Sequence, residues 1–189
     1  SIEAFRKHLE KFGLDKRIRE FKESTATVEE AAKVNSCEPA RIAKSLSFII
    51  NDKNEFLSLL GSDKDPQFKK SFWYVVTGGC ENEDSSLKET VKREIKEETN
   101  LDVLESTYLN WILKYKSLGN DCIEYVFISR VNDTGIILNE ESIDYKWCSL
   151  EDFVNLIQWY GDKILLKKVL EEAINNKIYF KNERIEKFN

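Results

Sequence analysis

No apolar run in this 189-residue sequence is long enough to span a bilayer, and no secretory signal opens it. We therefore expect a cytoplasmic protein that does not bind a membrane. C-x-x-C spacing is also absent, which argues against a zinc site and against a redox pair of thiols. The four cysteines are expected to be free in a reducing compartment; they are Cys37, Cys80, Cys122 and Cys148.

An excess of basic residues is missing as well, because the formal net charge is −5 at pH 7. A general nucleic-acid coat needs a basic face, so this charge balance disfavours nucleic acid as a partner. The charge is unevenly spread: residues 1–44 hold ten Lys/Arg and eight Asp/Glu, and the remainder carries −7. An acidic remainder suits a site that collects divalent cations, and it equally suits an ordinary solvated surface.

Hydrophobic spacing divides the chain into a helical start and a longer mixed part. Apolar residues repeat at helical spacing over 2–12, Thr27-x-x-Glu30 forms a capping box, and Pro39 begins a third helix. The period then changes. Strands are expected at 47–50, 55–60, 72–76, 103–116, 122–131, 136–138 and around 145–147, and helices at 86–99 and 150–175, the last interrupted at Gly161-Asp162.

Strands that enclose one helix and are followed by further helices indicate an α+β sandwich. A chain of this length fits one domain with an appendage. We expect that domain over residues 45–180, preceded by the helical segment 1–44 and followed by a polar tail, 181–189, which frays.

Three glutamates gather on one side of the helix expected after the double glycine. Glu94 and Glu98 are i, i+4 neighbours and Glu97 is three residues from Glu94, so their charges destabilise the helix unless something neutralises them. Mg²⁺ prefers carboxylate oxygens and bridges to phosphates, and a metal held there can activate water. Arg93 could hold one carboxylate by a bidentate pair, and Gly78-Gly79 lets the backbone approach a metal or phosphate.

The glutamates alone do not establish a site, because Lys92 and Lys96 could neutralise them on an ordinary solvated helix. The frame around them is more specific. It resembles the Nudix box, which is Gly, five residues, Glu, seven residues, then Arg-Glu-aliphatic-x-Glu-Glu-x-Gly-aliphatic. This chain has Gly79, five residues, Ser85, seven residues, then Arg93-Glu94-Ile95-Lys96-Glu97-Glu98-Thr99-Asn100-Leu101. Over about 45–178 the resemblance implies a Nudix-like α/β/α sandwich with a mixed sheet.

Two positions depart from the box. Ser85 replaces its first glutamate, a residue that usually assists in the family, so weakened activity is expected rather than loss; Glu83 or Asp84 could substitute from the loop. Asn100 replaces the last glycine, which is a mild change because Asn also tolerates the left-handed position after a helix.

The resemblance also implies roles for individual residues. Glu94, Glu97 and Glu98 would bind Mg²⁺, or Mn²⁺ in its place, Gly79 would offer its carbonyl, and Arg93 would orient a glutamate. A general base often comes from a later loop in this family. Asn139-Glu140-Glu141 supplies the candidate Glu141, although such a loop tip equally suits solvating charges.

A nucleotide-like substrate would stack its base on an aromatic ring or fill an apolar slot. Four residues are candidates, and each equally suits core packing, since aromatics in strands usually pack; they are Phe68, Trp73, Trp111 and Tyr125.

The first 48 residues resemble the start of the YbaK-type aminoacyl-tRNA editing deacylases. The resemblance is carried by Phe5 to Leu14, Ser24 to Ala32 and Ile42 to Phe48, and it implies that Lys44 contacts a tRNA end or the substrate. The remaining sheet and substrate loop of that fold have no counterpart here. We therefore expect a helical appendage that packs on the core, promotes a homodimer or keeps weak RNA-end affinity.

Three functions follow from these patterns. The favoured one is metal-dependent hydrolysis of a diphosphate linkage in a nucleoside diphosphate joined to another group. The second is a nucleotide-binding Nudix module without catalysis, which Ser85 supports but three crowded carboxylates do not require. The third, binding of tRNA or other RNA through the first segment, is disfavoured by the acidic charge.

Overall fold

The computed structural model describes residues 44–62, 71–81, 83–117, 120–133 and 135–187. The helices expected in residues 1–43, most of the deacylase-like segment and the candidate Phe68 lie outside this part of the chain.

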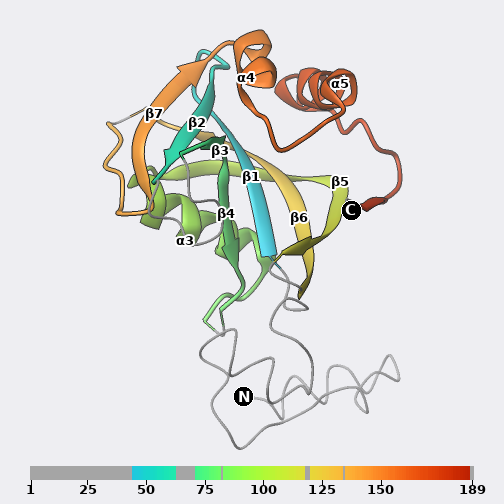
Figure 1. The fold of residues 1–189 in the computed structure, drawn as a ribbon, viewed down its shortest axis with the longest axis horizontal. Helices are drawn as coiled ribbons and strands as arrows, with labels where there is room; N and C mark the ends of the chain where they lie inside the picture. Colours follow the sequence, from blue (N-terminus) through green and yellow to red (C-terminus); the bar gives the residue numbers. More distant parts are fainter. Residues whose placement is uncertain (1–43, 63–70, 82, 118–119, 134, 188–189) are drawn as a thin grey trace, which may run out of the picture.

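The centre of the fold is one mixed sheet (Figure 1). Strand β1 runs parallel to β6 and β5 runs parallel to β8, whereas the other pairs are antiparallel. The order is β3-β2-β1-β6-β5-β8, with β4 paired to β1 and β7 paired to β2. The strands are β1 Lys44–Ile50, β2 Phe56–Gly61, β3 Trp73–Tyr74, β4 Val76–Gly79, β5 Val103–Ser117, β6 Asn120–Val131, β7 Ser142–Cys148 and β8 Arg184–Lys187.

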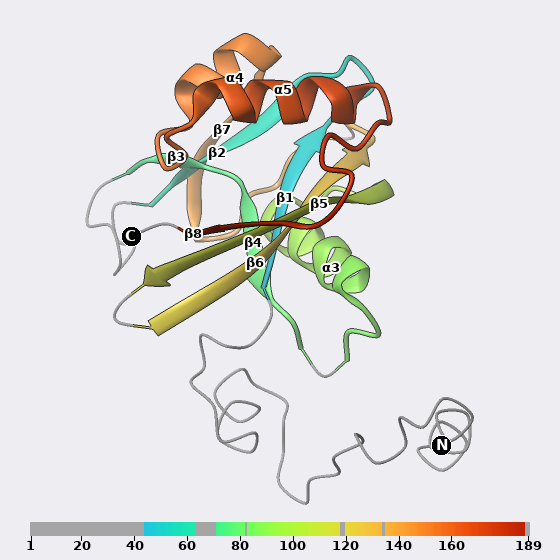
Figure 2. The same cartoon turned by 90° about the vertical axis from the view of Figure 1, so that its right-hand side faces the viewer.

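Helices cover both faces of this sheet (Figure 2). Helix α3, Leu87–Thr99, lies on one face, and α4, Leu150–Leu156, and α5, Lys163–Ile174, lie on the other. No helix in the described ranges is long and apolar enough to cross a membrane. The arrangement confirms the predicted α/β/α sandwich with a mixed sheet, and the break between α4 and α5 falls at Gly161-Asp162, as expected.

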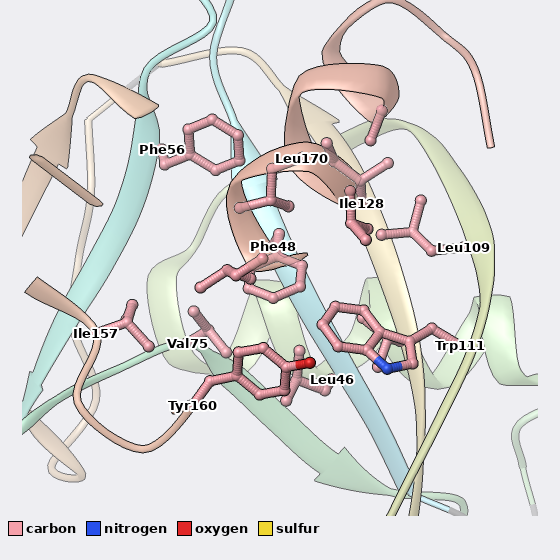
Figure 3. Close-up of a cluster of buried hydrophobic side chains, with 14 of the residues drawn as sticks. Leu46, Phe48, Phe56, Val75, Leu109, Trp111, Ile128, Ile157, Tyr160 and Leu170 are labelled. Carbon is pink, nitrogen blue, oxygen red and sulfur yellow. The ribbon is translucent and has the colours of Figure 1, made fainter. Parts of the chain in front are cut away.

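Alternation along β1 produces two hydrophobic cores, because successive strand side chains point to opposite faces. Phe48 is buried with Trp111 and Tyr160 on the face of α4 and α5 (Figure 3). Its neighbour Ile49 is buried on the other face with Ile95 of α3. The position of α3 is therefore fixed by its apolar stripe against the sheet.

Local signals at both ends set the length of α3. The Ser86 hydroxyl accepts a hydrogen bond from the Glu89 backbone N–H, which caps the first turn. At the other end Asn100 has φ 59°, in the left-handed region, and its backbone N–H donates to the Lys96 carbonyl. The left-handed position of Asn100 was expected from the sequence, and the helix, expected at 86–99, begins at Leu87, one residue after its cap.

Three expected features differ. The strand expected at 72–76 is divided at Val75 into β3 and β4, which pair with β2 and β1. Residues 136–138 form no strand; the Ile137 N–H donates to the Thr99 carbonyl instead of to a ladder. Residues 184–187, expected within a fraying tail, form β8 and pair with the edge of β5 at 111–114. The Tyr160 hydroxyl donates to Glu186 at 2.6 Å, so a buried aromatic residue fixes this strand.

Candidate active site

The candidate site lies where β4 ends and α3 begins. Gly79 pairs with Lys44 of β1, so the backbone of the double glycine is fixed by the sheet. A Cβ atom on Gly78 would lie 1.7 Å from Cδ of Glu94. Because glycine has no side chain, Gly78 leaves room for the Glu94 carboxylate in its observed position.

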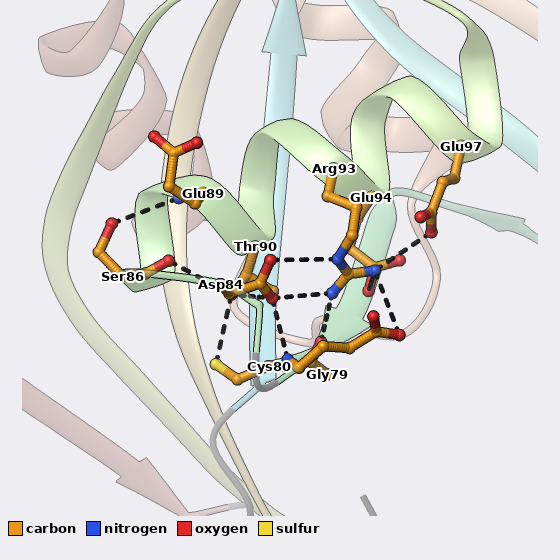
Figure 4. A network of polar contacts seen from close by, with 10 residues as sticks. Gly79, Cys80, Asp84, Ser86, Glu89, Thr90, Arg93, Glu94 and Glu97 are labelled. Atoms are coloured by element: carbon orange, nitrogen blue, oxygen red, sulfur yellow. Dashed lines mark hydrogen bonds and ion pairs between the residues drawn. The ribbon is translucent and has the colours of Figure 1, made fainter. Parts of the chain in front are cut away.

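Arg93 connects the glycine turn to the helix (Figure 4). Its Nη1 donates to Glu94 at 2.8 Å and to Glu97 at 3.1 Å. Its Nη2 donates to the Gly79 carbonyl at 2.7 Å and to Asp84 at 3.0 Å, and its Nε donates to the other Asp84 oxygen at 3.2 Å. One guanidinium thus orients two of the glutamates expected at a metal and the expected carbonyl.

Glu98 lies deepest of the three box glutamates, with an exposed fraction of 2%. Among the described residues its Oε2 atom has no hydrogen-bond partner. Burial raises the pKa of Glu98 well above its usual range, and the charges of Glu141 and Glu94 raise it further, against the Thr77 backbone N–H. The protein therefore places an incompletely compensated carboxyl beside two other acidic groups.

Glu94 shares this acidic surrounding. Burial raises its pKa to about 7, against the opposing effect of Arg93 and with a further contribution from the charges of Glu97 and Glu141. Glu141 comes from the turn before β7, where its carbonyl accepts from the Ser62 N–H at 2.9 Å. The structure thus brings the loop carboxylate close enough to influence the glutamates of α3.

The glutamates do not converge as a ready ligand set. In the described part of the chain, no three acidic, histidine or cysteine side chains are grouped closely enough to hold a metal ion. Arg93 holds Glu94 and Glu97 in ion pairs, whereas Glu98 lies against the Thr77 backbone. Helical spacing correctly places the three residues on α3, but two of the carboxylates pair with Arg93 whereas the third faces the backbone of β4.

The aromatic candidates have different surroundings. Trp73 is half-buried on β3, and the Lys146 ammonium lies 4.7 Å from its ring centroid. Tyr125 is half-buried and its ring centroid lies 6.1 Å from that of Tyr108. Trp111 is fully buried in the core. Its position agrees with the packing alternative and not with the predicted contact to a substrate.

Asp84 and Thr90 contribute contacts that helical spacing did not single out. The Thr90 hydroxyl donates to Asp84 at 2.9 Å and lies 3.4 Å from the Cys80 sulfur. Burial opposes ionisation of Asp84, but hydrogen bonds from Arg93, the Glu81 backbone and Thr90 lower its pKa. The signal available in the sequence was a polar residue, Thr90, directly before Val91, which belongs to the apolar stripe that packs α3 against the sheet.

The chain is similar in sequence and in fold to known proteins. The NUDIX domain family matches residues 41–169. A dihydroneopterin triphosphate diphosphatase from Haemophilus influenzae is 29% identical over 133 residues, covering 63% of this chain and 80% of that protein. The structure of a MutT protein from Methanosarcina mazei superposes with a TM-score of 0.57 at 27% identity, covering 72% of this chain and 96% of that one.

A C. elegans Ap4A hydrolase structure has a TM-score of 0.55 at 22% identity and covers 71% of this chain and 98% of that one, which shows the shared fold. The family match spans more than half of this chain and includes the glycine turn, Arg93 and the glutamates of α3. We conclude that this chain belongs to the NUDIX family and is a Nudix hydrolase.

Proposed function

We propose that this Nudix hydrolase uses Mg²⁺, or Mn²⁺ in its place, to cleave a diphosphate linkage in a nucleotide-like small molecule. The observation that supports this most is the buried Glu98 oxygen without a hydrogen-bond partner in the described residues, beside the charges of Glu94 and Glu141. An uncompensated buried carboxylate costs free energy. A divalent cation that prefers oxygen ligands removes that cost.

The residues near Glu98 would supply oxygen ligands for such a cation once Glu97 turns from Arg93. Glu94 lies in the space left at Gly78, and Glu97 has 55% of its side chain exposed, so it has room to turn. The Gly79 carbonyl accepts from Arg93 but has a second lone pair. We assign Glu94, Glu97, Glu98 and the Gly79 carbonyl as ligands. When bound, the cation would neutralise phosphate charge and lower the pKa of a coordinated water.

The other residues act on orientation and on the proton. Arg93 orients Glu94 and the Gly79 carbonyl through its hydrogen bonds, and it pairs with Glu97 before the cation binds. Glu141 is exposed at the loop before β7 and close to Glu94, so we assign it as the base that accepts a proton from the attacking water.

The substrate is proposed to carry a planar ring joined to two or more phosphates. The Haemophilus influenzae relative is named for dihydroneopterin triphosphate, and a nucleoside diphosphate joined to another group has the same general form. The half-buried Trp73 and Tyr125 are our candidates for contacting such a ring system. We expect a small-molecule substrate rather than nucleic acid, and a homodimer is compatible with this function.

A substrate panel tests the proposal. Dihydroneopterin triphosphate, ADP-ribose, a dinucleoside polyphosphate, a nucleoside triphosphate, a nucleotide sugar and capped RNA would each be incubated with Mg²⁺. We expect turnover of at least one compound, its loss with EDTA and its recovery with added Mg²⁺ or Mn²⁺. No turnover of any compound, with Glu97→Gln behaving as the wild type, would contradict the proposal.

A second candidate is a nucleotide-binding module without catalysis, which Ser85 at the first acidic position of the box favours. It predicts that a panel compound raises the melting temperature of the protein but is recovered intact after incubation with Mg²⁺. Product formation on the same sample separates the two functions.

Gly78→Ala should reduce turnover without unfolding the protein. The new methyl group would meet the Glu94 carboxylate, which is the far end of a flexible side chain and must move away. Displacing a catalytic group by about 1 Å can cost about 100-fold in rate. We expect a kcat/KM loss of about that size, measured with the best panel substrate, and a melting temperature close to that of the wild type.

The control is Gly161→Ala, because a Cβ at Gly161 would meet no atom within 4 Å. It makes the same chemical change on the opposite side of the sheet and should leave kcat/KM unchanged. Equal activity of the two variants would show that the position of Glu94 does not matter for turnover.

A further inference from the structure

The box position that holds a glutamate in the family holds an uncharged residue in this sequence, but the structure places a neighbouring carboxylate against Arg93. Ser85, where the pattern has a glutamate, is exposed in the loop before α3. The preceding residue, Asp84, has only 7% of its side chain exposed and points to Arg93. The structure therefore places a carboxylate on the guanidinium from a position one residue earlier in the chain.

Asp84 and Arg93 form a bidentate pair of hydrogen bonds. Nε donates to Oδ1 at 3.2 Å and Nη2 donates to Oδ2 at 3.0 Å. Paired hydrogen bonds of this kind fix the plane of a guanidinium as well as its distance. The remaining N–H groups then point to Glu94, Glu97 and the Gly79 carbonyl.

Contacts other than those with Arg93 also hold the Asp84 carboxylate. Its Oδ2 accepts from the Glu81 backbone N–H at 2.9 Å, and its own N–H donates to the Glu81 carbonyl at 3.2 Å. The hydroxyl of Thr90, which is fully buried on α3, donates to the same oxygen at 2.9 Å. A turn of the loop and the buried side of the helix thus fix the carboxylate together.

We propose that Asp84 is the positioning residue of this site and replaces the glutamate that the box lacks at Ser85. Through Arg93 it orients Glu94, Glu97 and the Gly79 carbonyl, which are the groups assigned as ligands of the cation. This inference rests on the proposed function, and it explains how catalysis persists with serine at position 85. Asp84 acts through Arg93 and does not touch the substrate.

The test compares Asp84→Asn, which removes the charge at constant size, with Glu83→Gln, which removes the exposed neighbouring charge. Mn²⁺ affinity is measured by the electron paramagnetic resonance of the free ion, and kcat and KM with the best panel substrate. Loss of a residue that orients metal ligands typically costs 10–100-fold. We expect Asp84→Asn to lose roughly 10- to 100-fold in Mn²⁺ affinity and in kcat, with KM unchanged, and Glu83→Gln to match the wild type.

A rescue variant separates positioning from a structural role. Asp84→Ala combined with Ser85→Glu returns the carboxylate to the position of the box, and we expect it to recover most of the Mn²⁺ affinity and kcat. If Asp84→Asn does not fold, this double variant decides: a folded double variant without Mn²⁺ binding overturns the inference.

Wild-type values for Asp84→Asn, or equal losses in Glu83→Gln, would also overturn it while the wild-type enzyme remains active. A wild-type protein that neither binds Mn²⁺ nor turns over any panel compound would instead refute the proposed function, and this inference with it.

Discussion

Glu98→Gln is expected to lose about 10³-fold in kcat/KM while its metal-free form becomes more stable than the wild type. Groups placed for catalysis contribute about 10²–10⁴-fold. The stability gain comes from removing a buried carboxyl whose ionisation the fold disfavours: Glu98 is 2% exposed, and burial together with the charges of Glu141 and Glu94 raises its pKa. A buried, incompletely satisfied group costs about 1–3 kcal/mol, and each kcal/mol shifts the melting temperature of a chain of this size by about 2–4 °C, so we expect a melting temperature higher by roughly 2–12 °C.

The two effects are measured on the same preparation, kinetics with Mg²⁺ and thermal unfolding with EDTA. Glu89→Gln is the matched control, because Glu89 lies on the same helix, is 46% exposed and pairs with Lys92. It should change neither activity nor melting temperature. A Glu98→Gln variant with wild-type activity, or with a lower metal-free melting temperature, would show that Glu98 is a structural residue.

Trp111→Ala should have the largest effect on stability. Trp111 is fully buried and its ring contacts those of Tyr160, at 5.2 Å, and Phe180, at 5.8 Å, and stacks on Phe48 at 6.5 Å. Truncating a buried tryptophan typically costs about 3–5 kcal/mol. For a domain of this size the melting temperature should fall by about 10 °C.

The same variant decides whether Trp111 contacts the substrate. Measured below the lowered melting temperature, KM should equal the wild-type value, because the ring is enclosed by the core. Trp111→Phe keeps an aromatic ring and removes an indole N–H that has no hydrogen-bond partner in the described part of the structure, so it should cost less. An unchanged melting temperature with a raised KM would instead place Trp111 at the substrate.

Helix α3 could be predicted almost completely because its determinants are local. Ser86 and Asn100 mark its ends, and Val91 and Ile95 define its buried side, all within one short segment. The same locality made the box recognisable, since its spacing follows the turns of the helix. The family comparison then confirmed the domain that this frame indicated.

Features that depend on distant contacts could not be predicted. The choice of Asp84 over Glu83 as the partner of Arg93 depends on the folded loop, which turns one side chain inward and leaves the other exposed. The different partners of Glu97 and Glu98 depend on the folded chain, which brings Arg93 to the first and the Thr77 backbone to the second. Helical spacing predicts the side of the helix on which a carboxylate lies, but it does not predict which charged group that carboxylate contacts.

Strand β8 was missed for a related reason. Its four residues are mostly polar and exposed, so they resemble a frayed end, and only the available edge of β5 makes them a strand. A short segment of this kind takes its conformation from the neighbour that offers hydrogen bonds, not from its own propensity.

The pairing of β8 with β5 also bears on how the protein avoids self-association. Without β8 the backbone N–H and C=O groups along 111–114 would be uncovered, and such an edge is a template for strands of other molecules. The exposed residues Arg184 and Lys187 place charges on the new outer edge, a common device against intermolecular pairing. The last strand thus covers the hydrogen-bonding groups of this sheet edge, a contribution that is separate from any part in catalysis.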